Sequence, residues 1–147
     1  MTVLSSDSDL RAYPKDPELI VGIVAPIGTP LKYFKHRLSK SLKGRAFTVH
    51  AIKLSEFAAK TLSPDENVRE LRPFHKYDRL MTLGNELRSR AGRDDVLAMF
   101  AAAELSATRP ADDPRHFAAT AFVVDQLKRP EEVHRFRRVY GEHFVLM

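Results

Sequence analysis

Glycine and hydroxyl residues follow an apolar segment near the start of the chain. Residues 19–25 (LIVGIVA) are apolar, and the next five residues, Pro26–Pro30 (PIGTP), read as a loop before a helix. Backbone N–H groups of such a loop, together with the positive end of the following helix, attract anions. We therefore predict a nucleotide-phosphate site here. The residues expected to form it are Gly22, Pro26, Ile27, Gly28, Thr29 and Lys32.

The lysine that a phosphate-binding loop normally carries is missing. The pattern G-x-x-x-x-G-K-[ST] is approached by Gly22 and Gly28, but the spacing is one residue too long and Thr29 follows Gly28 directly. Lys32 or Lys35 would have to reach the phosphate from the helix. The alternative is a glycine turn that only joins a strand to a helix, and the sequence leaves both interpretations open.

An acidic residue ends a second apolar segment, Ala121–Val124. A carboxylate at this place orders Mg²⁺ in phosphoryl-transfer enzymes of the phosphate-loop class. Asp125 is thus predicted to hold Mg²⁺ together with a nucleotide, and Lys128 and Arg129 are predicted to contact its phosphates. The alternative is that Asp125 accepts hydrogen bonds from nearby backbone groups and Lys128 and Arg129 are merely exposed.

Other chemistry is limited by what the chain lacks. It contains no cysteine and no H-x-E with C-x-x-C, so it cannot build a zinc deaminase centre, and no zinc is expected. No histidine pair has metal-ligand spacing. Four polar residues of a predicted helix at Tyr77–Ala91 lie opposite its leucines, where they meet either a base or phosphate, or only water. They are Arg79, Asn85, Glu86 and Arg88.

Strands alternate with helices around these residues, which predicts an α/β fold: a three-layer parallel sheet with right-handed crossovers. Ligands of such sheets bind at the carboxyl ends of the strands. Met1–Pro17 is polar and is expected to be a flexible arm, and residues 18–147 are expected to form one domain. The predicted strands are Leu19–Ala25, Ala46–Leu54, His116–Val124 and His143–Met147. The first predicted helix is capped by Thr29, has Pro30 in its first turn and ends at Gly44. The other predicted helices are a short one capped by Ser55, Tyr77–Ala91 ended by Gly92, a helix from Asp94 or Asp95 to about Ala107, and one that opens at Pro130 and stops at Gly141.

Composition and charge favour a cytoplasmic protein with an anionic partner. The 147 residues are 44% hydrophobic and 29% charged, and no apolar run or leader pattern predicts a membrane or secreted location. The net charge is +5, and no acid lies between Glu18 and Glu56, where seven basic residues occur. A nucleotide, a nucleic acid or an acidic protein would suit this surface. The alternative is a solvated helix face.

Three stretches resemble the N-terminal half of bacterial two-part deoxycytidylate deaminase-like proteins. They are GIVAPIGTPL, YDRLMTLGNELRSRAGRDDVL and AFVVDQLKRPEEVHRFRRVYGEHFVLM. That half is similar to P-loop nucleoside and nucleotide kinases, in which segments like Leu83–Arg88 and Asp125–Glu131 recur. The resemblance implies a P-loop kinase-like topology and a role in anti-phage defence, in which the group depletes deoxycytidine nucleotides.

Three functional hypotheses follow. The first is a degenerate kinase-like domain that binds a nucleotide or signal and regulates a deaminase module or another effector protein. The second is an active nucleoside or nucleotide kinase with a rearranged phosphate loop, in which Lys32 or Lys35 replaces the missing lysine. The third is a binding module that uses its basic helix for nucleic acid or an acidic protein and binds no nucleotide.

Overall fold

Four strands carry the predicted apolar segments. The computed structural model of the protein describes residues 18–108 and 119–147. The arm expected at Met1–Pro17 and the first residues of the strand expected at His116–Val124 lie outside the described residues. The strands are β1 (Glu18–Gly22), β2 (Thr48–Lys53), β3 (Thr120–Asp125) and β4 (Phe144–Leu146).

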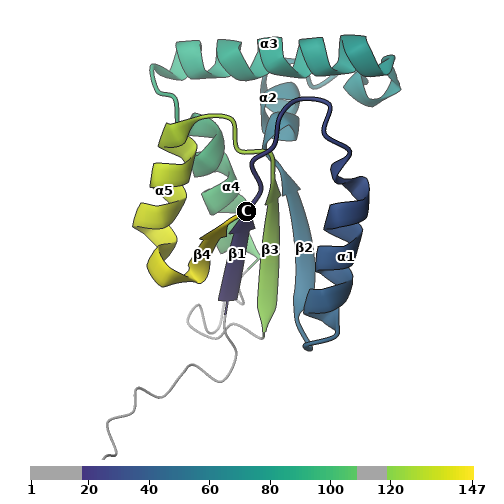
Figure 1. Ribbon diagram of the computed structural model, residues 1–147. Coiled ribbons are helices and arrows are strands. Elements are labelled where there is room, and N and C mark those ends of the chain that lie inside the picture. The colour runs from purple at the N-terminus through teal and green to yellow at the C-terminus, as the bar shows by residue number, and fades with distance from the viewer. Residues whose placement is uncertain (1–17, 109–118) are drawn as a thin grey trace, which may run out of the picture.

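The four strands form one parallel sheet in the order β2-β3-β1-β4. Gly22 of β1 lies beside Val124 of β3, and Lys53 of β2 lies beside Asp125. The carboxyl ends of these three strands therefore meet at one edge of the sheet (Figure 1).

Helices cover both faces of the sheet, which confirms the predicted three-layer α/β class (Figure 1). On one face, α1 packs its leucines against Ala121 and Val123. On the other face, side chains of the remaining helices pack around Ile20, Phe122 and Val124. The helices are α1 (Leu31–Lys43), α2 (Leu54–Leu62), α3 (Pro73–Ala91), α4 (Val96–Ala107) and α5 (Pro130–Tyr140), with 3-10 turns η1 (Val68–Glu70) and η2 (Gly141–His143).

The connections of β1 and β3 leave the sheet in opposite directions. The loop after β1 leads to α1 on one face, whereas the segment after β3 leads to α5 on the other. A crevice lies beside this point, lined by Thr29 from the loop after β1 and by Asp125 at the end of β3. Parallel α/β sheets bind ligands at such a switch point. Helix α3 runs across this end of the sheet (Figure 1).

Several predicted boundaries differ from the observed ones, and two differ by several residues. The first strand ends at Gly22 rather than Ala25, because the segment after β3 turns in against Ile23: the Leu127 N–H donates to the Ile23 carbonyl at 2.9 Å. Helix α3 begins at Pro73 rather than Tyr77. Proline fits the first helical turn, where its missing N–H has no intrahelical partner to lose.

The predicted hydroxyl caps do not form. The residue before α1 is Pro30, with no side-chain cap, so Thr29 does not cap the helix and is left facing the crevice. Ser55 lies inside α2, which begins one residue earlier. Gly92 ends α3 in the left-handed conformation at φ 63°, as its position predicts. No helix within residues 18–108 and 119–147 has the length and apolar character needed to span a membrane.

Candidate functional site

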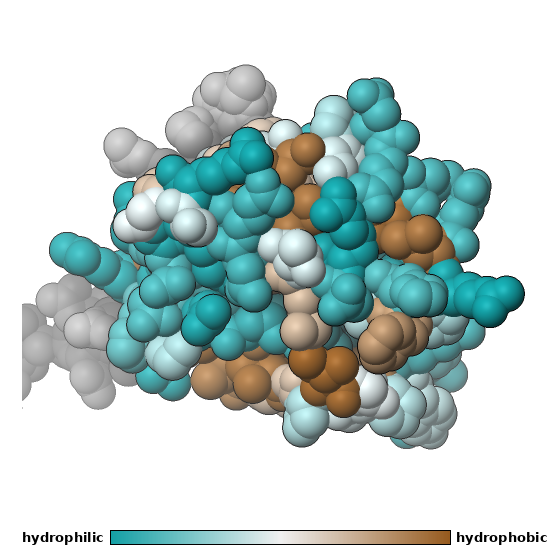
Figure 2. Space-filling view, turned by 90° about the horizontal axis from the view of Figure 1, so that it is seen from above, coloured by the Kyte–Doolittle hydropathy of each residue, from teal (hydrophilic) through white to brown (hydrophobic). Residues whose placement is uncertain are grey.

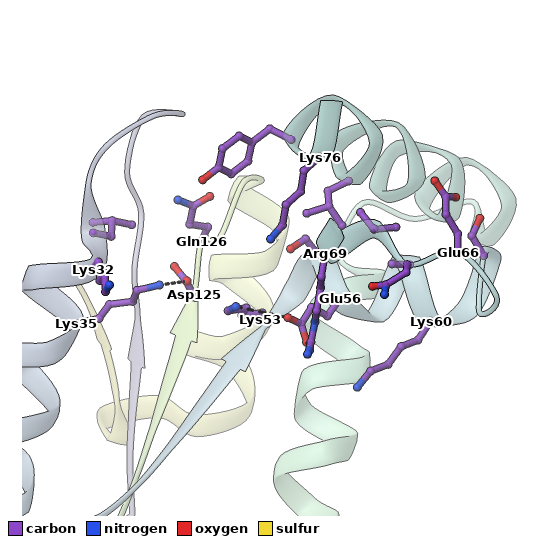
Figure 3. Close-up of a pocket in the computed structure, with 18 of the residues that line it drawn as sticks. Lys32, Lys35, Lys53, Glu56, Lys60, Glu66, Arg69, Lys76, Asp125 and Gln126 are labelled. Atoms are coloured by element: carbon purple, nitrogen blue, oxygen red, sulfur yellow. Dashed lines mark hydrogen bonds and ion pairs between the residues drawn. The ribbon is translucent and has the colours of Figure 1, made fainter. Parts of the chain in front are cut away.

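A cleft of about 460 Å³ opens at the carboxyl ends of the strands. Its walls come from the start of α1, from β2 and α2, from the η1 segment and from α3 (Figure 3). Asp125 and Gln126 form its floor where β3 ends. Gln126 has φ 62°, a left-handed conformation that a non-glycine residue adopts at a cost. The volume lies in the range of small-molecule sites, about 300–1,000 Å³.

Cations outnumber acids in this cleft. The lining cations are Lys32, Lys35, Lys53, Lys60, Arg69 and Lys76, and the lining acids are Glu56, Glu66 and Asp125. Seen from above, this end of the molecule is mostly hydrophilic, with small separate apolar areas (Figure 2). Such a concave basic surface concentrates anions.

Every acid that lines the cleft is already paired with a cation. Lys35 forms an ion pair with Asp125. Glu56 accepts a hydrogen bond from Arg69 at 2.9 Å and lies 3.5 Å from the Lys53 ammonium. Glu66 is held at 2.7 Å by Arg79, whose guanidinium also reaches Ser63. The pKa of Glu56 reflects its partners. Burial favours protonated Glu56, but Arg69 and Lys53 outweigh it and lower the pKa of that carboxyl.

Three lysines of the cleft have no acidic partner among the described residues: Lys32, Lys60 and Lys76. Lys76 descends from α3 toward the space above Asp125, whereas Lys60 points away from it (Figure 3). These ammonium groups are thus available to an anion. One acceptor is also free, because Oδ1 of Asp125 is buried and has no hydrogen-bond partner. Buried polar atoms are nearly always paired, so a ligand or water donor is expected there.

A second, more apolar pocket of about 310 Å³ adjoins the cleft under α3. Thr29, Ser55, Tyr77, Leu80 and Gln126 line both, so the two spaces adjoin. The remaining walls of this pocket combine apolar side chains, two glycines and a few polar groups. They are Ile27, Gly28, Leu54, Met81, Gly84, Asn85, Arg88, Leu97, Lys128 and Arg129.

Arg88 is the buried polar group of the second pocket. Its Nη2 donates to Oε1 of Glu132 at 2.6 Å, and its Nη1 donates to Asn85 at 3.3 Å. Oε2 of Glu132 accepts the backbone N–H groups of Lys128 and Arg129 at 2.7 and 3.1 Å. This network joins α3 to the start of α5. It leaves Arg88 Nε buried without an acceptor, so one donor faces no protein partner.

The two predicted glycines, Gly22 at the end of β1 and Gly28 in the loop after it, are needed for different reasons. Gly28 has φ 89°, which favours glycine, and an added Cβ there would touch nothing, so its backbone conformation is what requires glycine. Gly22 is different. A Cβ on Gly22 would lie 2.6 Å from Leu127 and 2.8 Å from Phe144. Gly22 therefore permits close packing between β1 and its neighbours, and it does not line either space.

The structure brings the other predicted site residues to one end of the molecule. Thr29, Lys32 and Asp125 line the basic cleft, with Pro30, whereas Ile27, Gly28, Lys128 and Arg129 line the second pocket. Pro26 lies in the same loop, where its carbonyl accepts from the Thr29 N–H at 3.2 Å. Partial burial lowers the pKa of Lys128, and the charges of Asp125 and Glu132 offset part of that effect.

Several residues of the site did not enter the predicted set. Lys53, Tyr77, Lys76 and Gln126 line the cleft but have no local pattern that marks them. The only signal for Lys53 was its place at the end of a parallel strand, where it lies beside Asp125. Of the four polar residues on the predicted 77–91 helix, Asn85 and Arg88 face the second pocket, while Arg79 and Glu86 form ion pairs with Glu66 and Arg90.

Whether Asp125 holds a metal stays a prediction. Among the described residues, no group of three or more histidines and acids is arranged to hold a metal ion. Lys35 occupies one oxygen of Asp125, and Leu31 lies near the position where a magnesium-binding hydroxyl is wanted.

Comparison with known proteins adds no family assignment. No protein-family model matches the chain, and a search of curated proteins finds no significant similarity to it.

Proposed function

We propose that this domain is a degenerate P-loop nucleotide-kinase-like module that binds a nucleotide in its two adjoining spaces. The phosphates bind in the basic cleft, where Lys32 and Lys76 lack acidic partners. The base binds in the apolar pocket under α3, where Asn85 and Arg88 are polar lining residues. The placement of a cationic cleft next to an apolar pocket, with five lining residues in common, is the observation that carries the proposal. A nucleotide is anionic at one end and planar and apolar at the other.

Gly28 and Thr29 sit between the two parts of the ligand in this arrangement. The loop exposes its backbone at Gly28, and Thr29 lines both spaces. The Thr29 hydroxyl can donate to a phosphate oxygen, since it forms no helix cap. Lys128 and Arg129 approach from the segment after β3 and supply charge at the edge of the second pocket.

The nucleotide part of the proposal is tested by thermal melting of the full chain with nucleoside mono-, di- and triphosphates, inorganic tripolyphosphate and uncharged nucleosides. Ligands that bind only the folded state raise the melting temperature. We expect nucleotides to raise it more than tripolyphosphate at equal concentration, and nucleosides to raise it least. A flat response to every phosphate compound would refute the proposal.

Matched variants place the binding site. Lys76→Met removes an unpaired cation of the cleft, and Lys40→Met removes an exposed cation of α1 that lines neither space. Only Lys76→Met is expected to reduce the shift. An equal loss in both variants would indicate nonspecific attraction to the basic surface, or binding along α1, as the nucleic-acid alternative requires.

The regulatory part of the proposal rests on the resemblance of the sequence to deoxycytidylate deaminase-like proteins. The ligand-bound domain is proposed to control a deaminase-type effector in anti-phage defence. Sedimentation of the chain with a deoxycytidylate deaminase module, with and without the nucleotide identified by melting, tests this part. Nucleotide-dependent association supports it, and the absence of any complex contradicts it.

A further inference from the structure

The state of Asp125 bears on how the cleft would hold phosphate. A carboxylate at the end of β3 was expected to order Mg²⁺, and Mg²⁺ is typically bound by one or two carboxylates together with phosphate oxygens and water. In the structure the same carboxylate forms an ion pair with Lys35, which reaches it from α1 (Figure 3). The Asp125 side chain is 13% exposed and that of Lys35 is 32% exposed, so the pair is partly shielded from water.

The remaining acids of the cleft cannot take over as metal ligands without losing their own partners. Glu56 is bound by Arg69 and Lys53, and Glu66 is bound by Arg79. A divalent cation at the free Oδ1 of Asp125 would lie next to the Lys35 ammonium on the same carboxylate. Repulsion between close charges in a poorly hydrated site is strong.

We propose that the cleft binds the phosphates of its ligand without a divalent cation, and that Lys35 is the built-in counter-ion that replaces Mg²⁺ beside Asp125. With all three acids paired, the unpaired Lys32, Lys60 and Lys76 leave an excess of positive charge in the cleft. That excess neutralises a polyphosphate directly. This inference rests on the proposed function and adds the cofactor requirement of the same site.

The inference also separates two of the functions that the sequence left open. Phosphoryl transfer uses metal ions to bridge the phosphate oxygens and neutralise developing charge. A cleft that holds phosphates through lysines alone can bind a nucleotide as a signal. It lacks the metal ion that phosphoryl transfer uses. The site is then a sensor rather than a kinase.

The first test is calorimetric titration of the full chain with inorganic tripolyphosphate and with ATP, in excess EDTA and in excess magnesium chloride. We expect the affinity in EDTA to equal or exceed that in magnesium, because metal-bound phosphates carry less charge toward the lysines. Affinity that falls tenfold or more in EDTA would overturn the inference but leave the proposed function standing. Absence of binding in both solutions would overturn the two together.

Substitution of Asp125 should change the phosphate affinity in opposite directions in a site built from lysines and in a magnesium-dependent site. Asp125→Asn removes the partner of Lys35 and frees its ammonium for phosphate, so the affinity is expected to stay the same or rise in EDTA and in magnesium chloride alike. In a magnesium site the same variant loses the metal ligand, and binding collapses. A tenfold or greater loss of affinity in Asp125→Asn, with an unchanged circular dichroism spectrum, would contradict the role given to Lys35.

A metal-binding readout tests the pair without any nucleotide. Mn²⁺ replaces Mg²⁺ at oxygen sites, and its free concentration is measured by electron paramagnetic resonance. Wild type is expected to leave the Mn²⁺ signal unchanged. Lys35→Met, which exposes the Asp125 carboxylate, is expected to reduce it. Lys32→Met is the matched control, since Lys32 lies on the same helix and lines the same cleft but pairs with no acid of the described residues. Mn²⁺ binding by wild type at Asp125 would overturn the inference.

Discussion

The charged residues near α3 form two groups that differ in how fully they are paired. Toward α5, Arg88, Glu132 and the backbone of residues 128–129 form a buried network, which we call the closed network. Both oxygens of Glu132 are bonded in it, and of the Arg88 nitrogens only Nε has no acceptor. Toward β2, the cleft carries more cations than acids. The first group holds two helices together. The second group has unpaired cations, and we assign phosphate binding to it.

The difference shows that the number of charges does not identify a site. Arg88 and Lys76 both extend from α3, but only Lys76 lacks an acidic partner in the described structure. Removing a residue of the closed network should therefore cost stability. Removing a cation of the open group should cost affinity and leave stability nearly unchanged.

The largest expected effect is on stability and comes from Glu132→Gln. This change leaves the Arg88 guanidinium buried without its charged partner, and losing one partner of a buried pair costs about 3–5 kcal/mol. Urea unfolding measures the loss. Glu131→Gln, on the adjacent exposed position of α5, is the control and should change the free energy of unfolding by less than about 0.5 kcal/mol. Equal effects of the two changes would show that the network does not stabilise the fold.

The next effect is on affinity and comes from Lys76→Met. A charge-assisted hydrogen bond to a ligand phosphate contributes roughly 1.5 kcal/mol or more, so we expect about a tenfold weaker binding of tripolyphosphate. Stability should change little, because no acid loses its partner. Calorimetry and urea unfolding of the same variant separate the two quantities. A large loss of stability with unchanged affinity would place Lys76 in the structural group instead.

A smaller effect distinguishes the second pocket from the cleft. Gly84 lies inside α3 and lines the second pocket, and an added Cβ would lie 3.4 Å from Arg88 Nη1 and 3.9 Å from Leu97. Gly84→Ala should stabilise the helix by about 0.5–1 kcal/mol. Because the methyl group takes space from the base, it should lower nucleotide affinity a few-fold and leave tripolyphosphate affinity unchanged. Parallel losses for both ligands would mean that the base does not bind under α3.

The sequence predicted the sheet and the gathering of its candidate residues at one end of it, because the carboxyl ends of parallel strands lie together. Gly28 and Thr29 were chosen from a glycine-bearing loop after one strand and Asp125 from the end of another, and all three line the spaces at that end. Gly22 shows the limit of such local patterns. It was interpreted as part of a phosphate loop, but glycine is needed there because of Leu127 and Phe144, which are distant in sequence. Local periodicity cannot report such a contact.

The direction in which α3 crosses the sheet could not be predicted from the sequence either. Its leucine spacing predicted a helix with a buried face, but not that the helix would cross the strand ends and bring Lys76 and Tyr77 over Asp125. Arg88 was one of several polar residues on that helix. Only the fold places it beside Glu132, 44 positions away, and thereby assigns it to the closed network.

The smallest effect concerns a second closed group, where Asp95 before α4 joins Arg93 and Arg135. The hydrogen bond from Arg93 is the largest influence, and with Arg135 it outweighs partial desolvation and lowers the pKa of Asp95 to about 2 from 3.8. A lowered carboxyl pKa stabilises the fold above the unfolded value, so this contribution is complete above about pH 4 and is lost as the pH falls through about 2. Asp95→Asn should therefore cost about 0.5 kcal/mol at neutral pH, less as the pH falls toward 2, and nothing well below it. Urea unfolding across that range measures it, with Asp94→Asn as the exposed control. If the free energies of unfolding of wild type and Asp95→Asn differ by the same amount at every pH, Asp95 acts through its shape or neutral hydrogen bonds. The charge of Asp95 would then not stabilise this group.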